Sequence, residues 1–102
     1  MNDVIVSGSE NIYPAELERV LDRCAEVADA AVVGRTDDKW GEVPVAVVVL
    51  TESAEISRED VLALFDGELA RFKHPQDVVF THALPRNVMG KVLKFELRAT
   101  FG

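Results

Sequence analysis

The sequence predicts an α+β domain in which about three helices cover a small, mainly antiparallel sheet of about three strands, preceded by a short N-terminal β segment. Valine-rich runs at 27–33 and 43–50 flank a segment of loop-forming residues. Apolar residues recur at helical spacing after Pro14 and again after Ser57. No repeat or low-complexity stretch interrupts the 102 residues, so residues 1–102 are expected to form one domain.

The first predicted elements are a brief strand and a helix. The apolar run Val4 to Val6 is closed by Ser7 and Gly8, which are typical of a turn. Pro14 suits the first position of a helix, because its fixed φ fits there and its missing N–H is not needed. Apolar side chains follow at helical spacing, so we expect a helix from about Pro14 to Cys24, with Cys24 as a small buried thiol.

The middle of the chain predicts two strands, a second helix and a further strand. The runs Val27 to Val33 and Val43 to Leu50 are expected to be antiparallel neighbours joined by a loop. Ser57 stands three residues before an aspartate, a relaxed form of the capping box, and apolar residues continue to Leu69, although Gly67 weakens this helix. After Pro75, residues 78–80 form a short apolar run that indicates a strand.

The last part of the chain predicts an irregular loop and a final helix. The loop begins at Leu84 and ends at Gly90 and Lys91, and apolar residues from Val92 to Phe101 can pack a helix against the sheet. Gly90 can place Lys91 on a flexible tip, where its ammonium could meet a phosphate or a carboxylate. The alternative is that Lys91 is a solvated residue at the start of the final helix.

Composition excludes several classes of function. The 11 basic and 18 acidic residues give a net charge of −7, which argues against general binding to nucleic acid or to an anionic membrane. The longest apolar run, Val43 to Leu50, is too short to span a bilayer, and the first twenty residues lack the pattern of a signal peptide. The single cysteine, Cys24, cannot form an internal disulfide, which fits a reducing compartment, and we expect a cytoplasmic protein.

Residue types alone do not identify a reaction. The sequence has no nucleophile elbow, no phosphate loop of the Walker kind and no cysteine and histidine spacing that would hold a metal. His74 and His82 are interpreted as ordinary surface side chains rather than as a pair of ligands.

Four segments, in the same order, resemble the small C-terminal domain of acyl-CoA synthetases, members of the adenylate-forming superfamily. They are residues 3–18, 38–44, 71–75 and 84–93. The resemblance implies an enzyme that first activates a carboxylic acid as an acyl-adenylate, with ATP and Mg²⁺ bound through a large N-terminal domain. The small domain then turns, and coenzyme A forms the thioester. The large domain is not represented in this sequence, so the chain alone is expected to be inactive.

The resemblance gives Lys91 a catalytic role. Lys91 matches the lysine that contacts the carboxylate and α-phosphate region during adenylation, where a positioned ammonium offsets the repulsion between two anions. Gly90 would supply the mobility that the lysine needs. The surrounding residues also resemble the context in which protein acetyltransferases modify this lysine, so such an enzyme is an expected partner.

The resemblance also implies that the N-terminal motif takes part in coenzyme A binding. Gly8, Ser9 and Glu10 match the loop that approaches the pantetheine channel, where bare backbone can come close to a thin ligand. Many relatives have a second glycine at the position of Ser9. Asn2 falls where relatives usually carry the aspartate or lysine of the domain hinge, a departure from the family pattern.

The resemblance also implies a cleft for the nucleotide of coenzyme A. Trp40 and Phe72 match aromatic positions that can stack on adenine, which is worth roughly 1–3 kcal/mol by analogy with nucleic-acid bases. The alternatives are that Trp40 anchors its loop and that Phe72 packs in the core. Some relatives have basic residues at the positions of His74 and Gln76, so here the 3′-phosphate would meet Lys73, expected to be exposed, or the large domain.

Two other functions remain open on the sequence. One is the equivalent part of a peptide-synthetase adenylation domain, which delivers its acyl group to a carrier protein. That class tends to have an acidic residue soon after the Gly-Lys pair, where this chain has Val92 and Leu93. The other is a free-standing binding or regulatory module without catalysis. The sequence does not indicate which acid is activated.

Overall fold

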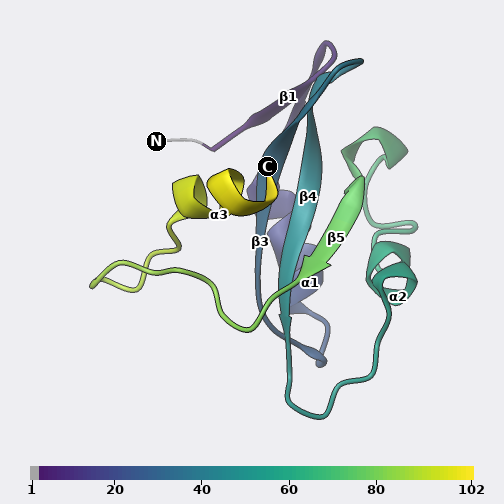
Figure 1. Cartoon of the computed structure of the whole chain (residues 1–102). Coiled ribbons are helices and arrows are strands. Elements are labelled where there is room, and N and C mark those ends of the chain that lie inside the picture. Colours follow the sequence, from purple (N-terminus) through teal and green to yellow (C-terminus); the bar gives the residue numbers. More distant parts are fainter. Residues whose placement is uncertain (1–2) are drawn as a thin grey trace.

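The computed structural model describes residues 3–102, so the predicted hinge position Asn2 lies outside the described residues. Five strands form one sheet, and three α-helices and one 3₁₀-helix pack around it (Figure 1). In chain order the elements are β1 (Ile5–Ser7), β2 (Glu10–Ile12), α1 (Pro14–Asp22), β3 (Val27–Asp37), β4 (Gly41–Leu50), α2 (Arg58–Ala63), η1 (Arg71–Lys73), β5 (Asp77–Phe80) and α3 (Lys94–Phe101).

Strand β4 is the centre of the sheet. It pairs antiparallel with β3 along nearly its whole length, from Gly41 opposite Asp37 to Leu50 opposite Val27. On its other side it pairs parallel with β5, and near its start it meets β1, which forms a hairpin with β2. The predicted α+β class and mainly antiparallel sheet are confirmed. The sheet has one strand more than predicted, because the N-terminal segment forms the hairpin of β1 and β2 rather than a single β segment.

The two faces of the sheet are covered by different helices, because buried residues alternate along β3 and β4. On one face the helices α1 and α2 cover the strands, and on the other face α3 lies across them (Figure 1). The first face buries Ile5, Ile12, Leu17, Val20, Leu21, Val32, Ala46, Val48, Val61, Phe65 and Val78. The second face buries Ala31, Val33, Val45, Val47, Leu84 and Leu97.

The predicted loop between the two long strands is mostly strand. β3 continues to Asp37, and only residues 38–40 turn the chain into β4. Gly34 belongs inside β3, because a Cβ at this position would lie 2.7 Å from the carboxylate of Glu42. The same carboxylate accepts a hydrogen bond from the N–H of Val6 at 3.2 Å, which connects β4 to β1. Gly34 therefore leaves room for the side chain of Glu42 and does not end β3.

The helices are shorter than predicted. α1 ends at Asp22, so Cys24 follows the helix and is half-buried rather than fully buried. α2 ends at Ala63 instead of Leu69, and the chain turns at Gly67, which has a φ of +76° that other residues rarely adopt. The final helix begins at Lys94 rather than near Val92. No helix within residues 3–102 is both long and apolar enough to cross a membrane.

Candidate functional site

Lys91 lies in a hydrogen-bonded turn between Leu84 and α3. The side-chain Oδ1 of Asn87 accepts from the N–H groups of Met89 (2.9 Å) and Lys91 (3.0 Å), and the N–H of Asn87 donates to the carbonyl of Lys91 at 2.9 Å. Gly90 has a φ of +85°, which closes the turn in a conformation that suits glycine. The sequence predicts a flexible tip here. In the structure these hydrogen bonds hold the turn, and Gly90 closes it with its positive φ.

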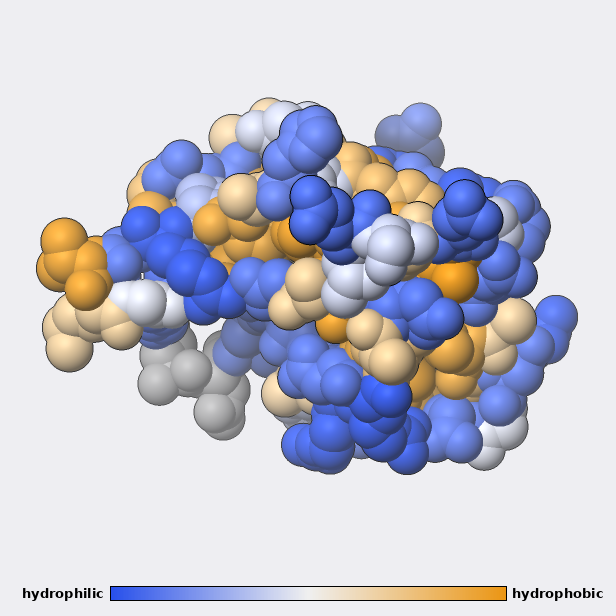
Figure 2. All heavy atoms as spheres, turned by 90° about the horizontal axis from the view of Figure 1, so that it is seen from below, coloured by the Kyte–Doolittle hydropathy of each residue, from blue (hydrophilic) through white to orange (hydrophobic). Residues whose placement is uncertain are grey.

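The tip of this turn is strongly exposed. Val88 and Met89 retain 103% and 87% of their accessible surface, and Lys91 is exposed. Figure 2 shows hydrophobic atoms on the projection where Figure 1 places this turn, at the left edge of the molecule. The ammonium of Lys91 makes no ion pair within residues 3–102. Its charge is therefore available to a ligand or to another domain.

The loop predicted to approach pantetheine lies against Trp40, one of the side chains predicted to stack on adenine. Gly8 forms the turn between β1 and β2 with a φ of +61°, and its N–H donates to the carbonyl of Trp40 at 2.7 Å. A Cβ at Gly8 would lie only 3.1 Å from Cε3 of the indole ring. Ser9 completes this turn, and Glu10 begins β2 opposite Ser7; both residues are exposed. Gly8, Ser9, Glu10 and Trp40 thus form one continuous surface, although they are far apart in the sequence.

The turn that carries Trp40 is held by an aspartate. Oδ2 of Asp37 accepts hydrogen bonds from the N–H groups of Lys39 (3.0 Å) and Trp40 (2.8 Å). The indole remains 47% exposed, and Nζ of Lys39 lies 4.9 Å from the ring centroid, a cation–π contact. Trp40 is therefore both a half-buried part of its turn and an aromatic surface that a ligand can reach.

The short helix η1 carries the second predicted aromatic contact. Phe72 is 47% exposed, so the alternative that it packs in the core is wrong. Lys73 was expected to be exposed, and it is instead half-buried. Its Nζ lies 3.1 Å from Oε1 of Glu16 on α1 and 5.8 Å from the centroid of the Phe72 ring. The Glu16 carboxylate offsets much of the positive charge that Lys73 would offer to a phosphate.

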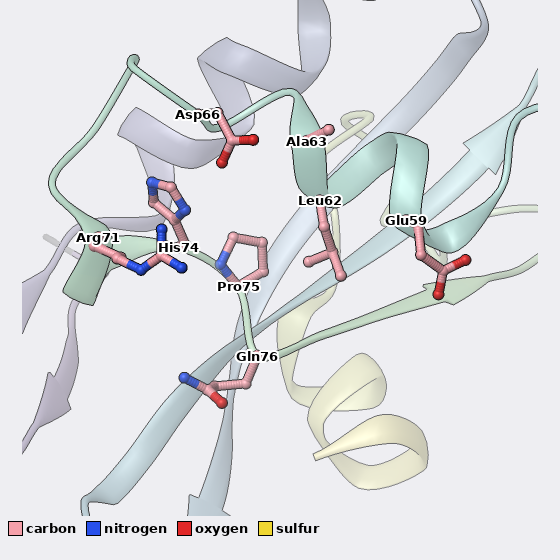
Figure 3. Close-up of a pocket in the computed structure, with 8 residues that line it drawn as sticks. All are labelled: Glu59, Leu62, Ala63, Asp66, Arg71, His74, Pro75 and Gln76. Carbon is pink, nitrogen blue, oxygen red and sulfur yellow. The ribbon is translucent and has the colours of Figure 1, made fainter.

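A pocket of about 430 Å³ opens beside η1 (Figure 3). It is lined by Glu59, Leu62, Ala63, Asp66, Arg71, His74, Pro75 and Gln76. His74 is turned inward, with Nε2 3.0 Å from the carbonyl of Leu69 and its ring 6.0 Å from that of Phe65. Arg71 is exposed and makes no ion pair within residues 3–102. It was not singled out from the sequence, although its place in the 71–75 motif was a signal.

A carboxylate on β5 links two other elements. Oδ2 of Asp77 lies 2.9 Å from Nη1 of Arg35 on β3, and Oδ1 lies 2.8 Å from Nε of Arg58 at the start of α2. The hydrogen bond from Arg35 lowers the pKa of Asp77 below its ordinary value of 3.8, against the opposing effect of burial, and the hydrogen bond from Arg58 lowers it further. This cluster holds the edge of the sheet next to the pocket.

The structure separates the predicted catalytic lysine from the predicted coenzyme A surface. In Figure 1 the turn of Lys91 projects at the left, whereas the turn between β3 and β4, which carries Trp40, forms the upper end of the molecule. η1, with Phe72 and Lys73, also lies in the upper half. Within residues 3–102 no three histidine, cysteine or acidic side chains gather as a metal site would require.

Comparisons with known proteins agree on one family. Residues 16–91 match the family model described as the AMP-binding enzyme C-terminal domain. The chain is 50% identical over 96 residues to indoleacetate–CoA ligase of Aromatoleum aromaticum, a match that covers 94% of this chain and 19% of that protein. The chain therefore spans about a fifth of the length of this curated relative.

Two solved structures show the same fold. ATP-bound MatB from Rhodopseudomonas palustris has a TM-score of 0.93 and 42% identity, over 98% of this chain and 20% of that one. The o-succinylbenzoate CoA synthetase of Bacillus subtilis, in complex with an acyl-adenylate intermediate, has a TM-score of 0.87 and 42% identity, over 94% of this chain and 19% of that one.

Proposed function

Because this chain belongs to the AMP-binding enzyme C-terminal domain family, the C-terminal domain of adenylate-forming CoA ligases, we propose that it is the small, mobile domain of a longer acyl-CoA ligase. Its first partner in this proposal is the large N-terminal domain of the same enzyme, which binds ATP, Mg²⁺ and the carboxylic acid. The observation that carries the proposal is the arrangement of two sites on one small fold. The free ammonium of Lys91 lies on one projection, and the joined surface of Gly8 and Trp40 lies on another.

In this proposal Lys91 is the catalytic residue of the adenylation step. The acid carboxylate attacks the α-phosphate of ATP, the acyl–phosphate bond forms, and pyrophosphate leaves. Both reactants are anionic, so an ammonium placed between them stabilises the transition state. The exposed, unpaired ammonium of Lys91 supports this role, because it can enter a site on another domain without breaking an ion pair within residues 3–102.

The test is Lys91→Ala in the full ligase, with the two half-reactions measured separately. Adenylation, followed by ATP–pyrophosphate exchange, should fall by roughly 10²–10³-fold, the loss typical of one well-placed electrostatic contact. Thioester formation from a supplied acyl-adenylate should be nearly unchanged, because Lys91 then faces away from the reacting atoms. Equal losses in both half-reactions would show that Lys91 supports folding or docking instead.

We propose that the second half-reaction uses the surface of Gly8, Ser9, Glu10 and Trp40, together with Phe72 on η1. The open backbone at Gly8 suits the thin pantetheine arm, and two half-exposed aromatic rings suit adenine. Trp40 is the single tryptophan, so its fluorescence reports on this surface alone. Coenzyme A should give a saturable change in fluorescence at low salt, weakly because the net charge of −7 opposes an anionic ligand. No saturable change would assign adenine binding to the two-domain enzyme only.

We also propose that Lys91 is open to acetylation when the small domain swings away. The exposed turn, with Val88 and Met89 beside the lysine, presents the ammonium to a modifying enzyme. Acetylation removes the charge that adenylation needs. Mass-spectrometric mapping after treatment with a protein acetyltransferase tests this, and modification that spares Lys91 would contradict it. We propose no particular acid as substrate, because the acyl pocket belongs to the large domain.

A further inference from the structure

The peptide unit between Gly90 and Lys91 is held at both of its polar ends. The carbonyl of Gly90 accepts a hydrogen bond from Nη1 of Arg86 at 2.6 Å, and the N–H of Lys91 donates to Oδ1 of Asn87 at 3.0 Å. Gly90 itself restrains this peptide little, because glycine has more accessible conformations than any other residue. Neighbouring atoms do not restrain it either, since none lies within 4 Å of where a Cβ would stand. Rotation of this peptide would break both hydrogen bonds.

Arg86 also ties the turn to the sheet. Its Nη2 pairs with Oδ2 of Asp29 on β3, 57 residues away in the sequence. Its backbone pairs with Val92 as an isolated β-bridge, and the N–H of Leu93 donates to the carbonyl of Pro85 at 2.8 Å. The guanidinium is a rigid, planar fork, so a nitrogen fixed on Asp29 fixes the direction of the nitrogen that holds Gly90.

We infer that Arg86 is a positioning residue for Lys91, and that the Arg86–Asp29 pair sets the direction in which the lysine side chain leaves the domain. This inference rests on the proposed function, in which the Lys91 ammonium meets the carboxylate and the α-phosphate. Arg86 touches neither reactant and acts through the peptide that carries Lys91. The geometry matters for rate, because a misplacement of about 1 Å can cost about a hundredfold in catalysis.

Kinetics of the full ligase test the inference. Arg86→Ala should lower the turnover number for adenylation by roughly 10–100-fold, the value of a lost hydrogen bond from a charged group. Thioester formation from a supplied acyl-adenylate should not change. The double variant Arg86→Ala, Lys91→Ala should be no slower than Lys91→Ala alone, since Arg86 acts only through Lys91.

Three further variants separate positioning from charge. Arg86→Lys should recover only part of the activity, because one ammonium cannot hold Gly90 and Asp29 together. Asp29→Asn should lower adenylation in the same direction as Arg86→Ala. Arg98→Ala is the matched control: it removes one positive charge from an exposed position on α3 that makes no ion pair within residues 3–102, so both half-reactions should keep their rates.

Nuclear magnetic resonance of this 102-residue chain gives a readout that does not depend on activity. In Arg86→Ala the heteronuclear NOE of the Gly90 and Lys91 amides should fall, while amides of β3 and β4 keep theirs. In Arg98→Ala no amide of the turn should change. An unchanged Gly90 amide in Arg86→Ala would overturn the inference.

The kinetic outcomes distinguish two kinds of failure. Normal adenylation by Lys91→Ala would overturn the proposed function itself. Loss of adenylation in Lys91→Ala together with normal adenylation in Arg86→Ala would overturn only the role of Arg86. Equal losses of both half-reactions in Arg86→Ala, or a further loss in the double variant, would mean that Arg86 acts on the whole domain and not through Lys91.

Discussion

Gly8 is the residue at which two parts of the proposed coenzyme A surface meet. Its φ of +61° and its distance to the indole of Trp40 are separate constraints, and both disfavour a side chain. Gly67 has only the first constraint, because its φ is +76° and a Cβ there would meet nothing within 4 Å. The two glycines therefore allow the cost of backbone strain to be separated from the cost of the contact.

We predict that Gly8→Ala disturbs Trp40 and Gly67→Ala does not. Each variant should lose about 1 kcal/mol or slightly more in its free energy of unfolding, because both place alanine in the left-handed region. Only Gly8→Ala should also shift the fluorescence maximum of Trp40 and raise the KM of the full ligase for coenzyme A. Urea unfolding and emission spectra measure both effects. Identical behaviour of the two variants would show that the contact with Trp40 has no consequence.

Arg71 lines the pocket of Figure 3 and makes no ion pair within residues 3–102, so in the proposed function it replaces Lys73 as the expected partner of the 3′-phosphate. We predict that Arg71→Ala in the full ligase raises the KM for coenzyme A by about tenfold, the value of one charge-assisted hydrogen bond. The KM for dephospho-coenzyme A, which lacks the 3′-phosphate, should stay the same. A rise with both substrates would place Arg71 elsewhere on the ligand or in the fold.

Single residues differ in how far the sequence predicts their role. Lys91 could be singled out because a glycine, a proline and basic residues surround it in a short loop. The contact between Gly8 and Trp40 could not be predicted, since it depends on the pairing of β1 with β4. The ion pair of Lys73 with Glu16 was also missed, because it joins two elements whose packing the sequence does not specify.

Strand β5 shows how one short element depends on its surroundings. Its four residues pair parallel with β4, a geometry that needs a crossover connection, and α2 and η1 lie in that connection. The long strands β3 and β4 were predictable from their valine-rich runs. The direction of β5 was not, because a run of three apolar residues has the same pattern in either direction.

The Asp77 cluster predicts how stability depends on pH. Because the pKa of Asp77 is lower in the folded state, its contribution is fully present above the ordinary value of 3.8 and is lost as pH falls through the folded pKa. Asp77→Asn should cost about 1–3 kcal/mol in free energy of unfolding at pH 7, since it weakens hydrogen bonds to two arginines.

Urea unfolding at pH 7 and pH 3 measures this prediction. The difference in free energy between wild type and Asp77→Asn should shrink at pH 3, because this pH lies below the ordinary pKa of 3.8 and the unfolded chain has mostly taken up its proton there. Asp38→Asn serves as the control, because Asp38 is exposed and makes no ion pair within residues 3–102. A difference that stays constant with pH would show that the charge of Asp77 is not what stabilises the cluster.

The whole molecule presents its two proposed sites in different directions. The free lysine projects on one side, and the surface of Gly8 and Trp40 lies at the end of the sheet (Figure 1). The paired strands β3 and β4 lie between them, so in the proposed enzyme a rotation of the whole domain would exchange one site for the other without a change of fold.

We predict that this chain does not activate acids by itself, because the proposed ATP and acyl sites belong to the large domain. Incubation with ATP, Mg²⁺ and a panel of carboxylic acids should give no ATP–pyrophosphate exchange above that of a heat-denatured sample. The full ligase is the positive control. Clear exchange by the 102-residue chain would contradict the proposal that the ATP and acyl sites lie on the large domain.

The positions of β3 and β4 in the sequence determine which of the two proposed sites is synthesised first. Its strands are neighbours in the sequence, so the hairpin and Trp40 can form soon after they leave the ribosome, whereas the pair that anchors the Lys91 turn joins residues 57 positions apart. The lysine is translated after every strand of the sheet. In the proposed enzyme, the residues of the coenzyme A surface are therefore translated before the lysine on which formation of the acyl-adenylate depends.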